Sequence, residues 1–193
     1  MDIRPPATIL QFSATIISDN KQDKLRSFVV QYYVEDKAFQ VFEKVVPNSG
    51  FNGGKFITKT VCNNPETGKP FEPKDIFLGA KVNINGFRFI LQEASEESLK
   101  IMESRPDVFV KADLSVIITK LRKVLAGKAP KILVEFQKHD TKKQFVVPLV
   151  DVQQVLEVFG IVMGDQEFLT LYRRYQFGKI DGFMYQDFCE AMA

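Results

Sequence analysis

The first half of the chain alternates apolar and polar residues at the period of a β-strand. Apolar side chains occupy every second position over residues 10–16 and again over 28–34. This alternation is typical of strands that bury one face and expose the other. The polar segment 35–37 then leads into a further alternation at 39–41, so we predict a hairpin there.

A second hairpin is predicted around the dipeptide Asn85-Gly86. It separates the runs 82–84 and 87–89. Both of its residues tolerate the positive φ angles of a type I′ turn, and this dipeptide between apolar runs is a strong short-range hairpin signal.

A helix is expected to close the first half. Ser95 is a suitable N-cap, the two glutamates that follow it favour the positive end of the helix dipole, and Pro106 ends the helix. Leu99 and Met102 are expected to face the sheet.

The second half changes to the spacing of helices. Apolar residues from Leu114 to Leu125 fall at i, i+3, i+4, i+7 and i+11, which is one face of a helix. Gly127 and Pro130 are expected to break this helix, and Asp165 is the expected N-cap of a later one. The further predicted helices span residues 131–139, 149–159, 165–175 and 185–192.

Length and composition are consistent with this division. The chain has 193 residues, of which 45% are hydrophobic, with 18 phenylalanines and no tryptophan. That content is enough for one large or two small domains, each burying a core. We therefore predict two domains, residues 1–106 and 107–193, joined by a segment so short that the domains are expected to touch.

Charge and cysteine content narrow the classes of function. The net charge is +2 and neither half is basic, which disfavours a nucleic-acid partner. Cys62 and Cys189 are far apart in the sequence and need no disulfide, so a reducing compartment is expected. No run approaches 18 apolar residues, so we predict neither a membrane span nor a secretion signal.

The glycine-rich segment 47–56 has a superficial likeness to a phosphate-binding loop. Such a loop needs a glycine five residues before its Gly-Lys pair and a serine or threonine after it. Here Ser49 and Phe56 occupy those two positions, and a strand is predicted to follow. We therefore expect a tight turn whose glycines supply positive φ angles, without a nucleotide.

Residues for catalysis are scarce. His139 is the only histidine and lies beside Asp140 at the end of a predicted helix. Neither cysteine has a neighbour at metal-ligand spacing. The sequence therefore predicts a protein that is not an enzyme, with no catalytic residue, no cofactor and no metal site.

Two segments of the second half have the spacing of EF-hand loops but lack most of the ligands. A calcium loop needs oxygen ligands at positions 1, 3, 5 and 12 and a glycine at position 6. In the first segment Asp140 is position 1 and Asp151 position 12, but positions 3, 5 and 6 are Lys142, Gln144 and Phe145.

The second segment departs further from that pattern. Its positions 1, 3, 5, 8 and 12 are Gln176, Gly178, Ile180, Phe183 and Asp187. Both segments keep an apolar residue at position 8, Val147 in the first and Phe183 in the second. We expect these two residues to pair across the loops and expect neither loop to hold calcium.

Residues 8–104 resemble a DM-ten domain. The matching segments occur in the order of that family, at residues 9–12, 17–19, 28–33, 42–43, 48–50, 53–56, 71–75, 79–82, 88–91 and 99–103. With the second half included, the chain is similar to the EF-hand-domain-containing ciliary proteins of the myoclonin and Rib-seventy-two type. It resembles their last DM-ten copy and EF-hand-like tail. Those proteins carry three copies and this chain carries one, so it is either a short member or a fragment.

The resemblance implies an α+β fold: a pleckstrin-homology-like β-barrel with a C-terminal helix, followed by an all-α degenerate EF-hand pair. It also implies a structural microtubule inner protein of the ciliary or flagellar axoneme, with tubulin and neighbouring inner proteins as partners. A calcium-responsive axonemal adaptor is the alternative. A lipid-binding module is a third possibility, for which Lys21, Lys24 and Arg26 are the local basic residues.

Overall fold

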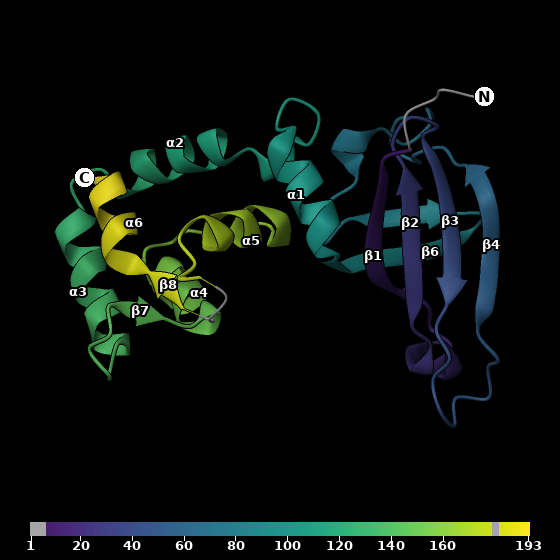
Figure 1. The fold of residues 1–193 in the computed structure, drawn as a ribbon, viewed down its shortest axis with the longest axis horizontal. Helices are drawn as coiled ribbons and strands as arrows, with labels where there is room; N and C mark the ends of the chain where they lie inside the picture. The colour runs from purple at the N-terminus through teal and green to yellow at the C-terminus, as the bar shows by residue number, and fades with distance from the viewer. Residues whose placement is uncertain (1–6, 179–181) are drawn as a thin grey trace. The chain divides into compact units, whose positions relative to one another are not determined.

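The computed structural model describes residues 7–178 and 182–193 and divides into two compact units, Met1–Lys111 and Ala112–Ala193. The first unit is built on one antiparallel sheet of six strands (Figure 1), in the order β4-β3-β2-β1-β6-β5. Its elements are β1 (Ile9–Ile16), η1 (Lys21–Leu25), β2 (Phe28–Tyr33), β3 (Ala38–Glu43), β4 (Gly54–Val61), η2 (Pro73–Asp75), β5 (Lys81–Ile84), β6 (Phe87–Ala94), α1 (Glu96–Ser104) and η3 (Val110–Ala112).

The strands form where the alternation of residues predicted them. Ile57, Val41, Val30 and Phe12 lie opposite one another on β4, β3, β2 and β1, and each is at most 6% exposed. The turn between β5 and β6 has Asn85 at φ 50° and Gly86 at φ 84°, as a type I′ turn requires. Both predicted hairpins are therefore confirmed.

The sheet is curled into a half-barrel. Phe56 on β4 packs against Phe28 on β2, with ring centroids 5.1 Å apart, and against Phe87 on β6, at 4.9 Å. Strands β4 and β6 are separated by three strands in the sheet, so this contact shows that the β4 edge curls across the face of the sheet toward β6. Aromatic packing of this kind fills the concave face. The two edge strands, β4 and β5, are not hydrogen-bonded to each other.

Helix α1 is attached to β1 by two serines. Ser95 is its N-cap, as predicted, and accepts a hydrogen bond from the Ser98 N–H at 3.2 Å. The Ser98 hydroxyl accepts from the Gln11 N–H at 2.7 Å, while the Ser95 N–H donates to the Gln11 carbonyl at 2.9 Å. The backbone of Gln11 is thereby satisfied just where the pairing with β6 ends.

The second unit consists of helices around a short two-stranded sheet. Its elements are α2 (Leu114–Leu125), α3 (Ala129–His139), β7 (Val146–Val147), α4 (Leu149–Val158), α5 (Asp165–Arg174), β8 (Phe183–Met184) and α6 (Tyr185–Met192). Val147 pairs with Phe183 between β7 and β8, which confirms the pairing expected from the sequence. None of the helices in the described ranges is long and apolar enough to cross a lipid bilayer.

The N-terminal ends of two helices differ from their predictions. Helix α3 begins at Ala129 and includes Pro130 in its first turn, because a proline there lacks only an N–H that has no partner within the helix. The N-cap of α5 is Gly164, and Asp165 is the first helical residue. Asp165 therefore acts as a negative charge in the first turn and does not cap the helix.

Aromatic rings occupy the centre of the helical unit. Phe136 stacks on Tyr185 with ring centroids 5.6 Å apart, and Phe183 contacts Tyr172 at 5.7 Å and Phe188 at 5.4 Å. All of these side chains are at most 3% exposed. They belong to α3, α5, β8 and α6, so one core joins the loops to the helices.

The turn before β4 generates the first prediction. Gly54 has φ +103°, and no neighbouring atom would lie within 4 Å of an added Cβ. A β-branched residue would therefore be strained by its backbone angle and not by a clash. We expect Gly54→Val to lower the free energy of unfolding by about 1–3 kcal/mol, measured by urea unfolding followed by circular dichroism. Thr58→Val, an exposed position on the same strand, is the control. An equal loss in both variants would contradict the assigned role of the backbone angle.

Candidate functional site

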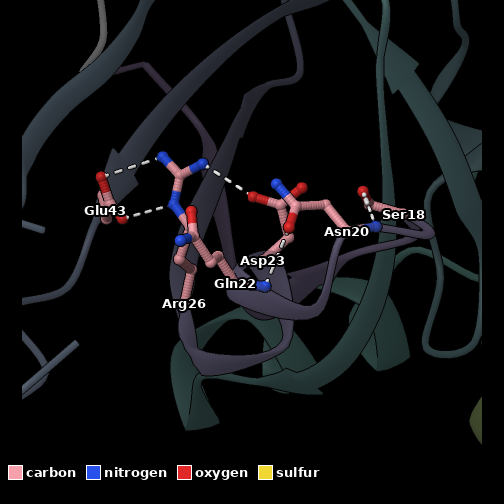
Figure 2. Close-up of polar contacts among 6 residues, drawn as sticks. All are labelled: Ser18, Asn20, Gln22, Asp23, Arg26 and Glu43. Carbon is pink, nitrogen blue, oxygen red and sulfur yellow. Dashed lines mark hydrogen bonds and ion pairs between the residues drawn. The ribbon is translucent and has the colours of Figure 1, made fainter. Parts of the chain in front are cut away.

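Arg26 is the centre of a polar cluster at the start of β2 (Figure 2). Its Nε and second terminal nitrogen donate to both carboxylate oxygens of Glu43, at 2.7 and 3.2 Å, and its other terminal nitrogen donates to Asp23 at 3.1 Å. The three side chains are between 10% and 17% exposed. A guanidinium held by two carboxylates in this way is fixed in orientation as well as in charge.

Local hydrogen bonds shape the segment that carries the cluster. Asn20 caps η1 by accepting from the Gln22 N–H at 3.0 Å, and the Ser18 hydroxyl accepts from the Asn20 N–H at 3.1 Å. A hydrogen bond with Ser18, followed by one from Arg26, lowers the pKa of Asp23. Short polar side chains of this kind favour turns and caps over regular helix, which is why the chain turns here between β1 and β2.

Aromatic rings surround the same guanidinium. Its carbon lies 4.3 Å from the ring centroid of Phe51, 4.9 Å from that of Phe56 and 5.1 Å from that of Phe28. Cation–π contacts of this length are attractive, and more so where water is excluded. Phe51 belongs to the glycine-rich segment 47–56, so Arg26 holds that loop against the sheet.

The glycine-rich segment is a turn that leads into a strand, as predicted. Gly53 has φ +70° and Gly54 φ +103°, and β4 begins at Gly54. A Cβ on Gly53 would meet the Val45 side chain at 2.8 Å. A strand and not a helix follows these glycines, so the segment does not lead into the helix N-terminus that a nucleotide loop uses to bind phosphate.

The basic residues considered for a lipid headgroup do not act together. Lys21 and Lys24 are exposed on η1, whereas Arg26 is held by Glu43 and Asp23. The hydrogen bonds that Arg26 donates to Glu43, opposed by burial, raise the pKa of the guanidinium. Arg26 therefore neutralises acidic side chains of the same domain and contributes no free charge to a ligand.

A second polar centre lies in the first EF-hand-like segment. Asp140 ends α3 and is only 7% exposed. Its carboxylate accepts from the Gln144 N–H at 3.0 Å, from the Phe145 N–H at 2.7 Å and from the Tyr185 hydroxyl at 3.0 Å. The carboxylate that would be the first cation ligand thus accepts hydrogen bonds from its own loop and from α6.

The electrostatics of this centre follow from those contacts. Burial opposes the charged form, but the N–H groups of Gln144 and Phe145 and the Tyr185 hydroxyl outweigh it and lower the pKa of Asp140. Burial, and then the Asp140 carboxylate, raises the pKa of Tyr185 to about 12. Tyr185 is therefore protonated at neutral pH and donates to a charged acceptor.

The remaining loop positions are not gathered around a cation. Asp151, at position 12, lies 3.2 Å from His139 Nδ1, and Lys142 and Gln144 are exposed. In the second segment Gln176 forms an isolated β-bridge with Phe183. Asp187 is exposed, and Ile180 lies outside the described residues. Within residues 7–178 and 182–193, no three His, Cys, Asp or Glu side chains are placed to hold a metal ion.

The two cysteines and the histidine are held by burial or by contacts with neighbouring side chains. Burial raises the pKa of the Cys189 thiol to about 12, which leaves it un-ionised and unreactive at neutral pH. The Cys62 sulfur lies 3.7 Å from the Asn85 side-chain oxygen, between β4 and the β5–β6 turn. His139 faces Asp151 at the junction of α3 and α4.

Comparison with known proteins agrees with this architecture. Residues 5–98 match the family model of the DM10 domain. The chain is 32% identical over 184 residues to EF-hand domain-containing family member C2 of Mus musculus, in an alignment that covers 90% of this chain and 24% of the mouse protein. It is 29% identical over 189 residues to EF-hand domain-containing protein 1 of Homo sapiens, in an alignment that covers 95% of this chain and 29% of the human protein.

Residues 5–98 of the chain therefore match a DM10 domain. The resemblance to the EF-hand domain-containing family that its sequence indicated is confirmed, because the match to those proteins extends through both units. The chain spans about a quarter of the length of the curated relatives it matches.

The Arg26 cluster generates the second prediction. Lysine keeps the charge but cannot make the paired contacts to Glu43 or stack on the rings as a plane. We expect Arg26→Lys to lower the free energy of unfolding by about 1–3 kcal/mol. Arg88→Lys, an exposed arginine on β6, should change it little. Urea unfolding followed by circular dichroism measures both, and equal effects would mean that the cluster adds nothing beyond charge.

Asp140 generates the third prediction. Its folded pKa is lower than its unfolded value of about 4, so its contribution to stability is complete above pH 4 and is lost as pH falls through the folded pKa. We expect Asp140→Asn to destabilise the chain at pH 7 by about 1–3 kcal/mol. The difference from the parent chain should shrink as the pH is lowered from 4 to 2.

Two further variants check that assignment. Tyr185→Phe should cost about 1 kcal/mol at pH 7, because one charged hydrogen bond is lost with little change of shape. Asp19→Asn, at an exposed carboxylate, should change the free energy of unfolding at pH 7 by less than about 0.5 kcal/mol. If the Asp140→Asn difference were the same at pH 7 and pH 2, the assignment of the ionised carboxylate would be wrong.

Proposed function

We propose that the chain is a non-enzymatic structural element of ciliary or flagellar doublet microtubules. In this role it lies in the doublet lumen, binds tubulin and neighbouring inner proteins, and stabilises the axoneme. The observation that carries the proposal is the match to EF-hand domain-containing proteins through both units. It is combined with polar centres whose charged groups are hydrogen-bonded within the protein.

The finer fold assignment belongs to the same proposal. The half-barrel followed by α1 is the counterpart of a pleckstrin-homology-like barrel with its C-terminal helix. The helical unit is a degenerate EF-hand pair. Its support is the β7–β8 pairing of Val147 with Phe183, at position 8 of both loops. Each loop of this pair lies between two helices, α3 and α4 for the first and α5 and α6 for the second.

The state of the first loop supports a structural role over a calcium-responsive one. A calcium loop gathers oxygen ligands at positions 1, 3, 5 and 12 around its cation. In this loop the Asp140 carboxylate already accepts from Gln144 and Phe145, and the next ligand position is Lys142. A carboxylate engaged within its own loop and a lysine at the next ligand position support a structural role over a calcium-responsive one.

Permanent assembly suits the distribution of groups on the chain. Binding through a large interface uses shape and many modest contacts, and it needs no single reactive pocket. The helical unit exposes aliphatic side chains on several helices, among them Val116, Val134 and Val150. Apolar exposure spread in this way is compatible with neighbours packed on more than one side.

Fractionation of isolated cilia with an antibody against this chain tests the proposal. Detergent removes the membrane and matrix, and high salt then removes peripheral axonemal proteins. We expect the chain to stay with the doublets until the doublets themselves are disrupted, because luminal proteins are enclosed by the tubule wall. Release by detergent or moderate salt would overturn a luminal position.

Calcium titration distinguishes the structural role from that of a calcium-responsive adaptor. If the chain is structural, millimolar calcium should leave its melting temperature where an equal concentration of magnesium leaves it. A ligand present far above its Kd stabilises the folded state by several kcal/mol. A rise in melting temperature specific to calcium would therefore favour the calcium-responsive adaptor.

A further inference from the structure

The half-barrel unit contains the dipeptide Asn-Gly in two different surroundings, at Asn52-Gly53 and at Asn85-Gly86. Both asparagines are exposed, so water and hydroxide reach the two sites alike. In an unfolded chain the two dipeptides undergo the same spontaneous reaction, because a glycine without a Cβ leaves its backbone nitrogen open to the preceding side chain. A difference in rate between the two sites therefore comes from the fold.

The reaction is deamidation through a cyclic imide. The backbone nitrogen of the glycine loses its proton to hydroxide and attacks the side-chain carbonyl carbon of the asparagine. The new N–C bond closes a succinimide ring, and the side-chain nitrogen takes a proton from water and leaves as ammonia. Water then opens the ring at either carbonyl and gives aspartate or isoaspartate. The reaction consumes only water and releases ammonia.

The turn between β5 and β6 restrains the Asn85-Gly86 site. The Gly86 N–H donates to the Asn83 side-chain oxygen at 3.1 Å, so the attacking nitrogen is already engaged. The Cys62 sulfur lies 3.7 Å from the Asn85 side-chain oxygen. Asn85 has φ 50°, and the paired strands hold the backbone on both sides of the turn. Ring closure would need a backbone rotation that a type I′ turn does not allow.

The Asn52-Gly53 site is less restrained. Among residues 7–178 and 182–193, no hydrogen bond involves the Asn52 side chain or the Gly53 N–H. Asn52 lies in the irregular segment between β3 and β4. Gly50, Gly53 and Gly54 surround it, and glycine gives the backbone more conformational freedom than any other residue. The rotation that ring closure needs is therefore available here.

We propose that Asn52 is a site of spontaneous deamidation and isoaspartate formation, whereas Asn85 is protected by its turn. The contrast between two identical dipeptides in one domain carries the proposal. One has its nitrogen, its side-chain oxygen and its backbone angle held, and the other lies in a loop rich in glycine. The proposal is independent of the ciliary assignment.

The modification falls in the loop that lies against Arg26. The ring centroid of Phe51, directly before Asn52, is 4.3 Å from the guanidinium carbon, and Gly54 pairs with Glu43 on β3. Isoaspartate lengthens the main chain between these fixed points by a methylene group, whereas aspartate changes only the charge. Isoaspartate should therefore displace the Phe51 ring or the start of β4.

Ageing of the intact chain tests the proposal. The purified chain is incubated at mildly alkaline pH, in buffer and in parallel in guanidinium chloride, then digested with trypsin and analysed by mass spectrometry. Cleavage after lysine and arginine places the two sites in separate peptides, residues 45–55 and 82–88. In buffer we expect Asn52 to deamidate about tenfold faster than Asn85 or more, because reaction at Asn85 requires local opening of the turn.

The denatured sample separates the effect of the fold from that of the sequence. In guanidinium chloride the two rates should be nearly equal, and fragment ions assign each modification to its asparagine. Absence of deamidation at Asn52 in buffer, or equal rates at Asn52 and Asn85 in buffer, would overturn the proposal. A difference of the same size in denaturant would assign it to the neighbouring sequence, and the proposal would fail.

Matched variants locate the protection. Asn83→Ala removes the acceptor of the Gly86 N–H and should raise the rate at Asn85 several-fold, with the rate at Asn52 unchanged. An unchanged rate at Asn85 would contradict the protection by Asn83. Asn52→Gln should suppress the modification at its position, because the longer side chain closes a larger ring far more slowly. Continued modification there would contradict the assignment to Asn52.

Unfolding of the aged protein tests the consequence for the loop. We expect the aged chain to unfold at a lower concentration of urea than the fresh chain. Aged Asn52→Gln and fresh Asn52→Asp should both match the fresh parent chain, because Asn52 is exposed and aspartate leaves the main chain unchanged. An equal loss in Asn52→Asp would assign the effect to the charge and overturn the role of the lengthened main chain.

Discussion

The helical unit depends on one buried carboxylate. A loop of this spacing turns sharply, so several of its backbone N–H groups point inward and need an acceptor. Asp140 supplies that acceptor, and Tyr185 donates to the same carboxylate from the far end of the unit. With the loop closed in this way, Val147 reaches its partner Phe183, and the aromatic core forms between them and the helices.

The loop carries a strained residue that this carboxylate stabilises. Phe145 has φ 62° and is 54% exposed, although a bulky side chain resists that backbone region and glycine is the usual residue there. The hydrogen bond from its N–H to Asp140 offsets part of the cost. In the half-barrel unit a positive charge also stabilises a loop. Arg26 is held by Glu43 and Asp23, and its guanidinium lies against the ring of Phe51 in the glycine-rich loop.

Much of the fold could be predicted because its signals are local. The alternation of apolar and polar residues predicted the strands, and Asn85-Gly86 predicted a turn. The spacing of the two EF-hand-like loops predicted that Val147 pairs with Phe183. The Arg26 and Tyr185 contacts could not be predicted, since each joins residues far apart in sequence whose approach depends on the finished fold. The curl of the sheet, set by Phe56 meeting Phe87, is of the same kind. The start of α3 was misplaced because proline breaks a helix interior yet suits a first turn.

The open half-barrel also bears on how copies of the chain behave at high local concentration. Strands β4 and β5 each have one edge that no strand of the sheet covers, and bare edges of this kind can recruit the edges of other molecules into continuous sheets. Lys55 and Lys59 are exposed along β4, and Lys81 is exposed on β5. Lysines along an edge strand disfavour its pairing with another edge, although the Lys59 ammonium is also in an ion pair with Asp36. The DM10 domain can thus stay unclosed and still resist polymerising through its own strands.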